Sequence, residues 1–125
     1  MSKHESYENK FNRTHDFTVR YELLAQKEHE VIITQGMRSD FCFEGEYLEK
    51  GYMVWPEFED EEGCLIEDSE ETISKTGTAR MWVLVEQSRP ELQSKIKVGE
   101  KGYFLFGSHK VAYVEIIDTS GFWVP

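Results

Sequence analysis

A chain of 125 residues is long enough for one domain with its own core and too short for two ordinary domains. Its 24 acidic residues against 14 Lys and Arg give a formal net charge of −10, which excludes nucleic-acid binding through a broadly basic surface. The aromatic share of 14% is high and favours strands around a substantial core.

We expect no signal for export or for the membrane. Residues 1–20 lack the apolar segment of a secretory signal, and no stretch approaches the ~20 apolar residues that cross a bilayer. Cys42 and Cys64 form no disulfide framework, so we expect two reduced thiols that fill space in a β structure. The expected location is cytoplasmic.

The first half of the chain predicts a polar arm followed by three strands. Residues 1–15 are polar and aperiodic, which is typical of a flexible N-terminal arm. Apolar and polar residues then alternate from Phe17 to Leu23, as in a strand with one face in water. Further strands are expected at Phe41–Phe43 and at Tyr52–Trp55. We expect Pro56 to end the third strand, because proline donates no hydrogen bond to a ladder.

An acidic segment follows the third strand. Nine of the fifteen residues from 57 to 71 are Asp or Glu, which predicts an exposed loop or hairpin with Gly63 at its turn. The spacing does not match an EF-hand calcium loop, which needs glycine at its sixth place; counting from Glu57, Glu62 stands there. Two readings remain, a solvated loop and a docking surface for a basic partner.

The second half begins with a strand and a short helix. Apolar residues alternate from Thr78 to Val85, which predicts a fourth strand. The run Ser-Arg-Pro-Glu at 88–91 fits a capping box with proline in the first turn. Leu92 and Ile96, four residues apart, would form the buried side of one or two helical turns.

A closing hairpin and an apolar tail complete the chain. The hairpin is expected to pair Tyr103–Phe106 with Val111–Ile117 around residues 107–109. The tail, residues 121–125, contains three large apolar residues, and we expect Trp123 to pack across the barrel or to close one of its ends.

These segments predict one all-β domain over residues 16–125. The expected architecture is a single small β-barrel of about six or seven mostly antiparallel strands, with one or two short helical turns. Closure into a barrel would remove exposed strand edges.

Three segments resemble the β-barrel domains of elongation factor Tu, especially its C-terminal barrel. Residues 19–24 look like its opening strand, residues 35–43 are similar to its Gly-Tyr-Arg-Pro-X-Phe-X-Phe segment, and residues 102–112 look like its final hairpin. The resemblance covers roughly residues 16–118 and implies a stand-alone barrel of this kind. The chain has Lys-Glu-His-Glu at 27–30 where the family has Glu-Gly-Gly-Arg. No GTPase domain or phosphate loop accompanies the barrel, so the resemblance carries over no functional residue.

The sequence contains no recognisable catalytic or metal-binding motif. The four histidines are scattered without the spacing of a zinc site, and the two cysteines form no CxxC pair. Ser108 and His109 are neighbours in an expected turn, where adjacent side chains point apart, so they do not form a nucleophile and base. We expect no enzyme activity and no cofactor. A site assembled by the fold from dispersed residues is the remaining alternative.

Two binding functions fit these observations. The first is a non-enzymatic acidic protein-binding module, in its sharpest form an immunity or antidote protein that neutralises a basic toxin such as a nuclease. The alternative is a stand-alone translation-factor-like barrel that binds RNA or a translation component. The expected partner-binding residues are the following carboxylates, with the aromatic face around Tyr52 and Trp55 next: Glu57, Glu59, Asp60, Glu61 and Glu62.

Overall fold

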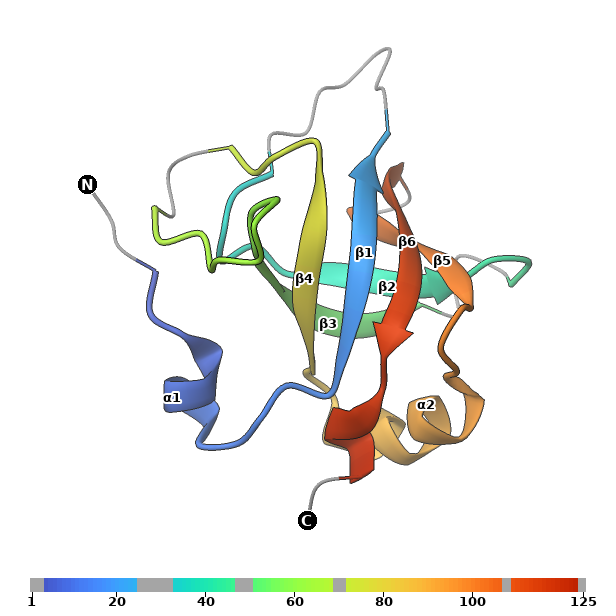
Figure 1. Ribbon diagram of the computed structural model, residues 1–125. Helices are drawn as coiled ribbons and strands as arrows, with labels where there is room; N and C mark the ends of the chain where they lie inside the picture. The colour runs from blue at the N-terminus through green and yellow to red at the C-terminus, as the bar shows by residue number, and fades with distance from the viewer. Residues whose placement is uncertain (1–3, 25–32, 47–50, 69–71, 107–108, 124–125) are drawn as a thin grey trace.

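The computed structural model describes residues 4–24, 33–46, 51–68, 72–106 and 109–123. Within these residues six antiparallel strands close into a barrel in the order β1-β4-β3-β2-β5-β6 (Figure 1). The all-β barrel predicted from the sequence is confirmed. The strands are β1 (Phe17–Leu23), β2 (Ser39–Phe43), β3 (Tyr52–Phe58), β4 (Thr76–Val83), β5 (Lys101–Phe106) and β6 (His109–Asp118). The helical segments are α1 (Tyr7–Phe11), η2 (Glu86–Ser88), α2 (Arg89–Lys95) and η3 (Ser120–Trp123).

The barrel interior is filled by alternate residues of each strand. In β1, Phe17, Val19 and Tyr21 are buried, whereas Arg20 and Glu22 are exposed, as the alternation predicted. β1 lies between β4 and β6, so the first strand closes the barrel against the last one (Figure 1). None of the helices in the described residues is long and apolar enough to cross a membrane.

β3 continues through Pro56, and the prediction that proline ends this strand is wrong. The N–H of Leu84 donates to Met53, and the N–H of Glu59 donates to Thr78. Odd-numbered residues of β3 therefore direct their backbone groups toward β4, and the nitrogen of Pro56 faces the other side. Pairing with β2 has ended there, at Val54 opposite Ser39. Proline is tolerated because no ladder hydrogen bond is required of its nitrogen.

Where β2 no longer pairs with β3, the side chain of the buried Gln35 supplies hydrogen bonds to the backbone of β3. The Gln35 side chain accepts a hydrogen bond from the Phe58 N–H at 2.7 Å and donates to the Phe58 carbonyl at 2.8 Å. It also donates to the Ile66 carbonyl at 3.0 Å. One side chain thus satisfies backbone groups at the end of β3 and in the loop that returns from it.

Residues 4–15 pack against the outside of the barrel, which differs from the loose arm expected from their composition. Ser6 caps α1 by accepting a hydrogen bond from the Glu8 N–H, and Asn12 ends it with a left-handed φ of 53°. Tyr7 is buried, and the covering segment buries Trp82 of β4 as well. β4 is therefore buried on both faces at Trp82, although the sequence predicted one outward face.

The short helix forms where it was expected, but its cap differs. Leu92 and Ile96 are buried, as their spacing predicted. The 3₁₀ turn η2 runs directly into α2, so Ser88 already has helical backbone angles and its hydroxyl donates to the Val85 carbonyl instead of capping. The predicted capping box is absent for this reason.

The C-terminal segment packs through Phe122, and the prediction for Trp123 is wrong. Phe122 is 3% exposed and stacks on Phe17 with a centroid separation of 5.7 Å, whereas Trp123 is 69% exposed. A Cβ on Gly121 would lie 1.8 Å from the His15 carbonyl oxygen, so only glycine allows this approach. The expected turn at residues 107–108 and the tail residues 124–125 lie outside the described residues.

Phe122→Ala should lower the free energy of unfolding by about 3 kcal/mol, because it leaves a cavity beside Phe17. Trp123→Ala should change it by less than about 0.5 kcal/mol, because that side chain lies mostly in water. Urea denaturation of both variants measures the difference. Equal losses for the two variants would contradict this packing of the tail.

Candidate functional site

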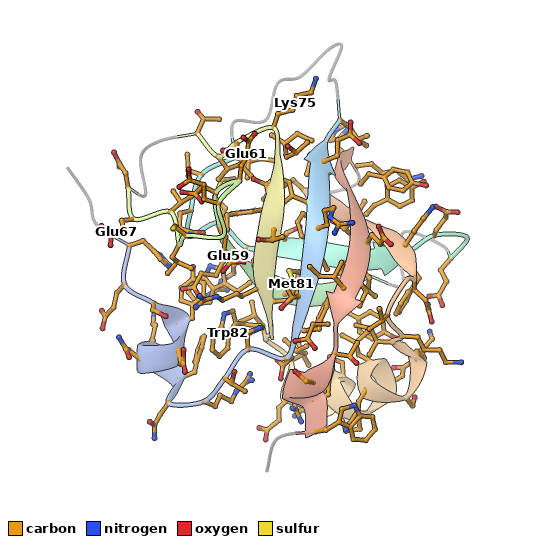
Figure 2. All side chains as sticks on the ribbon, in the orientation of Figure 1. Glu59, Glu61, Glu67, Lys75, Met81 and Trp82 are labelled. Carbon is orange, nitrogen blue, oxygen red and sulfur yellow. The ribbon has the colours of Figure 1, made fainter. Side chains whose placement is uncertain are left out.

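The five carboxylates predicted to bind a partner fall into two groups. Figure 2 shows Glu59 and Glu61 on the same side of the barrel, beside β4. Glu57 and Glu59 lie at the end of β3 and contact other side chains. Asp60 orders a turn, and Glu61 and Glu62 extend from that turn into solvent.

Glu57 is fully buried, so the expectation that it is exposed is wrong. Its Oε2 lies 2.7 Å from Nε2 of His4 and accepts a hydrogen bond from the Tyr7 N–H at 2.8 Å. The Arg80 guanidinium lies 3.9 Å from Oε1. A buried carboxylate needs such partners to offset its lost hydration. Because His4 and Tyr7 supply them, Glu57 holds the N-terminal segment against the barrel.

Glu59 is held by the neighbouring strand. It accepts a hydrogen bond from the Thr78 hydroxyl at 2.7 Å and pairs with Nε of Arg80 at 3.2 Å. Arg80 thereby lies close to Glu57 and to Glu59. Neither Glu57 nor Glu59 is available as a free charge for an incoming partner.

Asp60 holds the acidic turn in one conformation. Its Oδ1 accepts hydrogen bonds from the N–H groups of Glu62 and Cys64, both at 2.9 Å, and its own N–H donates to the Cys64 carbonyl at 2.7 Å. Gly63 adopts a φ of +83°, which fits the turn that the sequence placed at this glycine. The acidic turn, residues 60–64, is therefore ordered by its own hydrogen bonds, and the side chains of Glu61 and Glu62 point outward from it.

Glu61 and Glu62 are exposed and form no ion pair within the described part of the chain. A groove of about 700 Å³ is lined by the acidic turn and by residues of β1 and β4, among them Arg20 and Thr76–Thr78. Lys75 lies at the same end of β4 as Glu61 (Figure 2). These two carboxylates are the part of the predicted site that can meet a partner.

The N-terminal segment adds acidic side chains to this side of the molecule. The N–H of His4 donates to the Glu67 carbonyl at 2.6 Å, which ties the segment to the loop after the acidic turn. Glu5 and Glu67 are both exposed next to this contact. The sequence did not predict that these two acidic residues lie near each other, because residues 1–15 were expected to form a separate arm.

An aromatic cluster supports the N-terminal segment. Tyr7 packs on Trp55 with a centroid separation of 4.4 Å, and Phe11 packs on Trp82 at 5.6 Å. Burial and the Glu57 carboxylate raise the pKa of the Tyr7 hydroxyl, so this residue stays neutral at ordinary pH. The pairing of Trp55 with Trp82 across β3 and β4 was visible only once the register was known.

All five arginines of the chain are engaged within the molecule. Arg13 and Arg89 each lie 2.9 Å from Oδ1 of the buried Asp16, whose Oδ2 accepts a hydrogen bond from the Val83 N–H. Arg38 stacks over Trp55. The remaining two pair with carboxylates, Arg20 with Glu115 and Arg80 with Glu59.

The site offers no evident place for a metal ion. The described residues contain no group of three or more His, Cys, Asp or Glu side chains that could hold one. Cys42 is buried, as expected for a space-filling thiol, whereas Cys64 is exposed on the acidic turn and was wrongly placed inside. Comparisons with protein-family models, with curated proteins and with solved structures found no match to this chain.

Glu57→Ala should lower the free energy of unfolding by about 3 kcal/mol, because it leaves His4 and the Tyr7 N–H without their buried acceptor. Glu62→Ala should have an effect below about 0.5 kcal/mol. Urea denaturation followed by tryptophan fluorescence measures both. An unchanged midpoint for Glu57→Ala would contradict the fastening role.

Stability should fall below neutral pH through His15. Burial, followed by the nearby Arg80 guanidinium, lowers the pKa of His15 below its ordinary value of 6.5. The unfolded chain therefore binds a proton at a higher pH than the folded chain does, so stability decreases as pH falls through about 6.5. In urea denaturation at pH 7.5 and 5.5, His15→Gln should lose less stability than the parent. The same loss in both proteins would exclude this contribution.

Proposed function

We propose that this protein is a non-enzymatic module that binds a basic protein through its acidic turn. The observation that supports the proposal is that the acidic residues fall into two groups, those with partners inside the molecule and those exposed to solvent. The acids that the fold requires have partners within the molecule, whereas Glu61 and Glu62 are exposed on a turn that Asp60 orders. An ordered turn presents these charges with little loss of conformational entropy on binding.

The net charge and the contacts of the arginines support the same partner class. The arginines are occupied by intramolecular contacts, and the net charge is −10. A positively charged partner would be attracted over distances up to the screening length, about 8 Å at physiological salt, and its association would be accelerated. The sharpest version is an immunity or antidote protein that occupies the basic surface of a toxin such as a nuclease.

Removing the two free charges should slow association with the partner. We expect Glu61→Gln combined with Glu62→Gln to reduce the association rate constant about three- to tenfold at low salt, with a smaller change in dissociation. Affinity capture from native cell extract, with mass spectrometry, supplies the partner. Stopped-flow association at two salt concentrations then measures the effect.

Two matched variants make this test specific. Glu44→Gln combined with Glu100→Gln removes the same charge beside the start of β5, where the Glu44 N–H donates to the Lys101 carbonyl, and should change the rate constant much less. Lys75→Gln removes a cation at the same end of β4 as Glu61 and should accelerate association. Equal slowing by both glutamate pairs would place the contact away from the acidic turn.

The alternative function is a stand-alone translation-factor-like barrel that binds RNA or a translation component. The closed antiparallel barrel is the architecture that this resemblance implies. The net charge of −10 argues against direct RNA binding, because phosphate affinity depends largely on Lys and Arg that neutralise phosphates, although Lys95, Lys97, Lys101 and Lys110 fall close together in the sequence.

Nucleic acid should therefore bind more weakly than micromolar at physiological salt. Fluorescence anisotropy with single-stranded RNA and with duplex DNA, measured across a salt series, tests this. Micromolar or tighter binding that falls steeply as salt rises would favour the alternative over the acidic module.

A further inference from the structure

A second groove lies at the opposite end of β3 from the acidic turn. It has a volume of about 560 Å³ and is bounded by the start of β3, by β2 and by the η2–α2 segment. Its volume is within the roughly 300–1,000 Å³ that is typical of ligand pockets. The residues that define its chemistry are Asp40, Tyr52, Met53, Val85, Glu91 and Lys95.

The apolar part of the groove lining, called the floor below, consists of Met53 and Val85, and both side chains are unusually exposed. Met53 is 45% exposed and Val85 is 39% exposed, and only two other large apolar side chains in the described residues, Val98 and Trp123, are comparably exposed. Hydrogen bonds to their carbonyl groups hold both floor residues in place: the Leu84 N–H donates to the Met53 carbonyl, and the N–H and hydroxyl of Ser88 both donate to the Val85 carbonyl. Exposed apolar side chains on an ordered backbone are typical of interface anchors.

The rim of the groove is negatively charged. The one cation, Lys95, is neutralised by Glu46 at 2.9 Å and lies 3.4 Å from the Tyr52 hydroxyl. Burial raises the pKa of Tyr52, so this hydroxyl stays neutral at ordinary pH. Asp40 and Glu91 form no ion pair within the described residues. The rim is therefore complementary to cations beside an apolar anchor.

We infer that this groove docks a segment of a basic partner in which a large apolar side chain lies between two Lys or Arg residues. The apolar side chain covers Met53 and Val85, and the flanking cations approach Asp40 and Glu91. The inference rests on the proposed function and adds the apolar anchor that the acidic turn lacks. The seven residues of β3 span about 20 Å, so one interface of standard size can cover both surfaces.

Three short peptides test the inference without knowledge of the partner. We would titrate the ¹⁵N-labelled full chain with acetylated, amidated Gly-Arg-Leu-Arg-Gly, Gly-Arg-Ser-Arg-Gly and Gly-Glu-Leu-Glu-Gly. The first should shift the amide resonances of Asp40, Met53, Val85 and Glu91. Its Kd should be about tenfold lower than that of either other peptide, because only it matches both the floor and the rim.

Variants locate the contact. Met53→Ser and Val85→Ser should each raise the Kd of the first peptide about five- to tenfold. Val98→Ser removes a still more exposed apolar side chain outside the groove and should leave the Kd unchanged. The three side chains are solvent-exposed, so the folds should persist, and amide dispersion in each spectrum verifies this.

The outcomes separate this inference from the proposed function. Equal binding of both arginine peptides, with shifts confined to Glu61 and Glu62, would overturn the groove and support the acidic turn. Tighter binding of the glutamate peptide than of the arginine–leucine peptide would overturn the basic partner. If neither arginine peptide shifts any resonance, the groove is overturned, and the association kinetics with the captured partner decide the proposed function separately.

Discussion

Closure of the barrel is the constraint on which the other features depend. Each of the six strands pairs with a neighbour on both sides, so a strand residue points either into the core or outward. Charged residues of the strands must point outward, and the antiparallel register then decides which of them meet. In this chain the register places Glu57 opposite Arg80 and Trp55 opposite Trp82 on the outer face of β3 and β4.

The outer face so formed explains why the N-terminal segment packs against the barrel. Two tryptophans on adjacent strands would expose a large apolar surface, and α1 covers it with Tyr7 and Phe11. The cover also removes Glu57 from water, and the hydrogen bonds from His4 and from Tyr7 compensate this burial. Stability and surface charge are thus linked, because the same segment that buries one acid brings Glu5 toward Glu67.

The strands were predictable because alternation of apolar residues is a local signal that the barrel preserves. Tyr21 is an example: it is inward in the structure as it is in the pattern. Trp82 was not predictable, since its outward position is buried by a segment about 75 residues earlier in the chain. Pro56 misled the prediction for a similar reason. Whether proline ends a strand depends on which neighbour its nitrogen faces, and this is a property of the sheet.

The candidate site was predicted in part for the same reason. Composition located the acidic segment, and Gly63 located its turn, because both are local properties. The sequence could not separate Glu57 and Glu59 from Glu61 and Glu62, since the difference between them is a contact with Arg80 or with His4. Likewise, the choice of Phe122 over Trp123 as the residue that packs depends on a glycine that fits against the His15 carbonyl.

The exposed thiol of Cys64 gives the acidic turn a natural chemical handle. The chain has two cysteines, and the other, Cys42, is buried. A maleimide dye would therefore attach to the native protein at one position, directly beside Glu61 and Glu62. Its fluorescence would report the arrival of any molecule at this turn without an engineered cysteine. Oxidation of the same thiol to a sulfinic acid would add one more negative charge at that position.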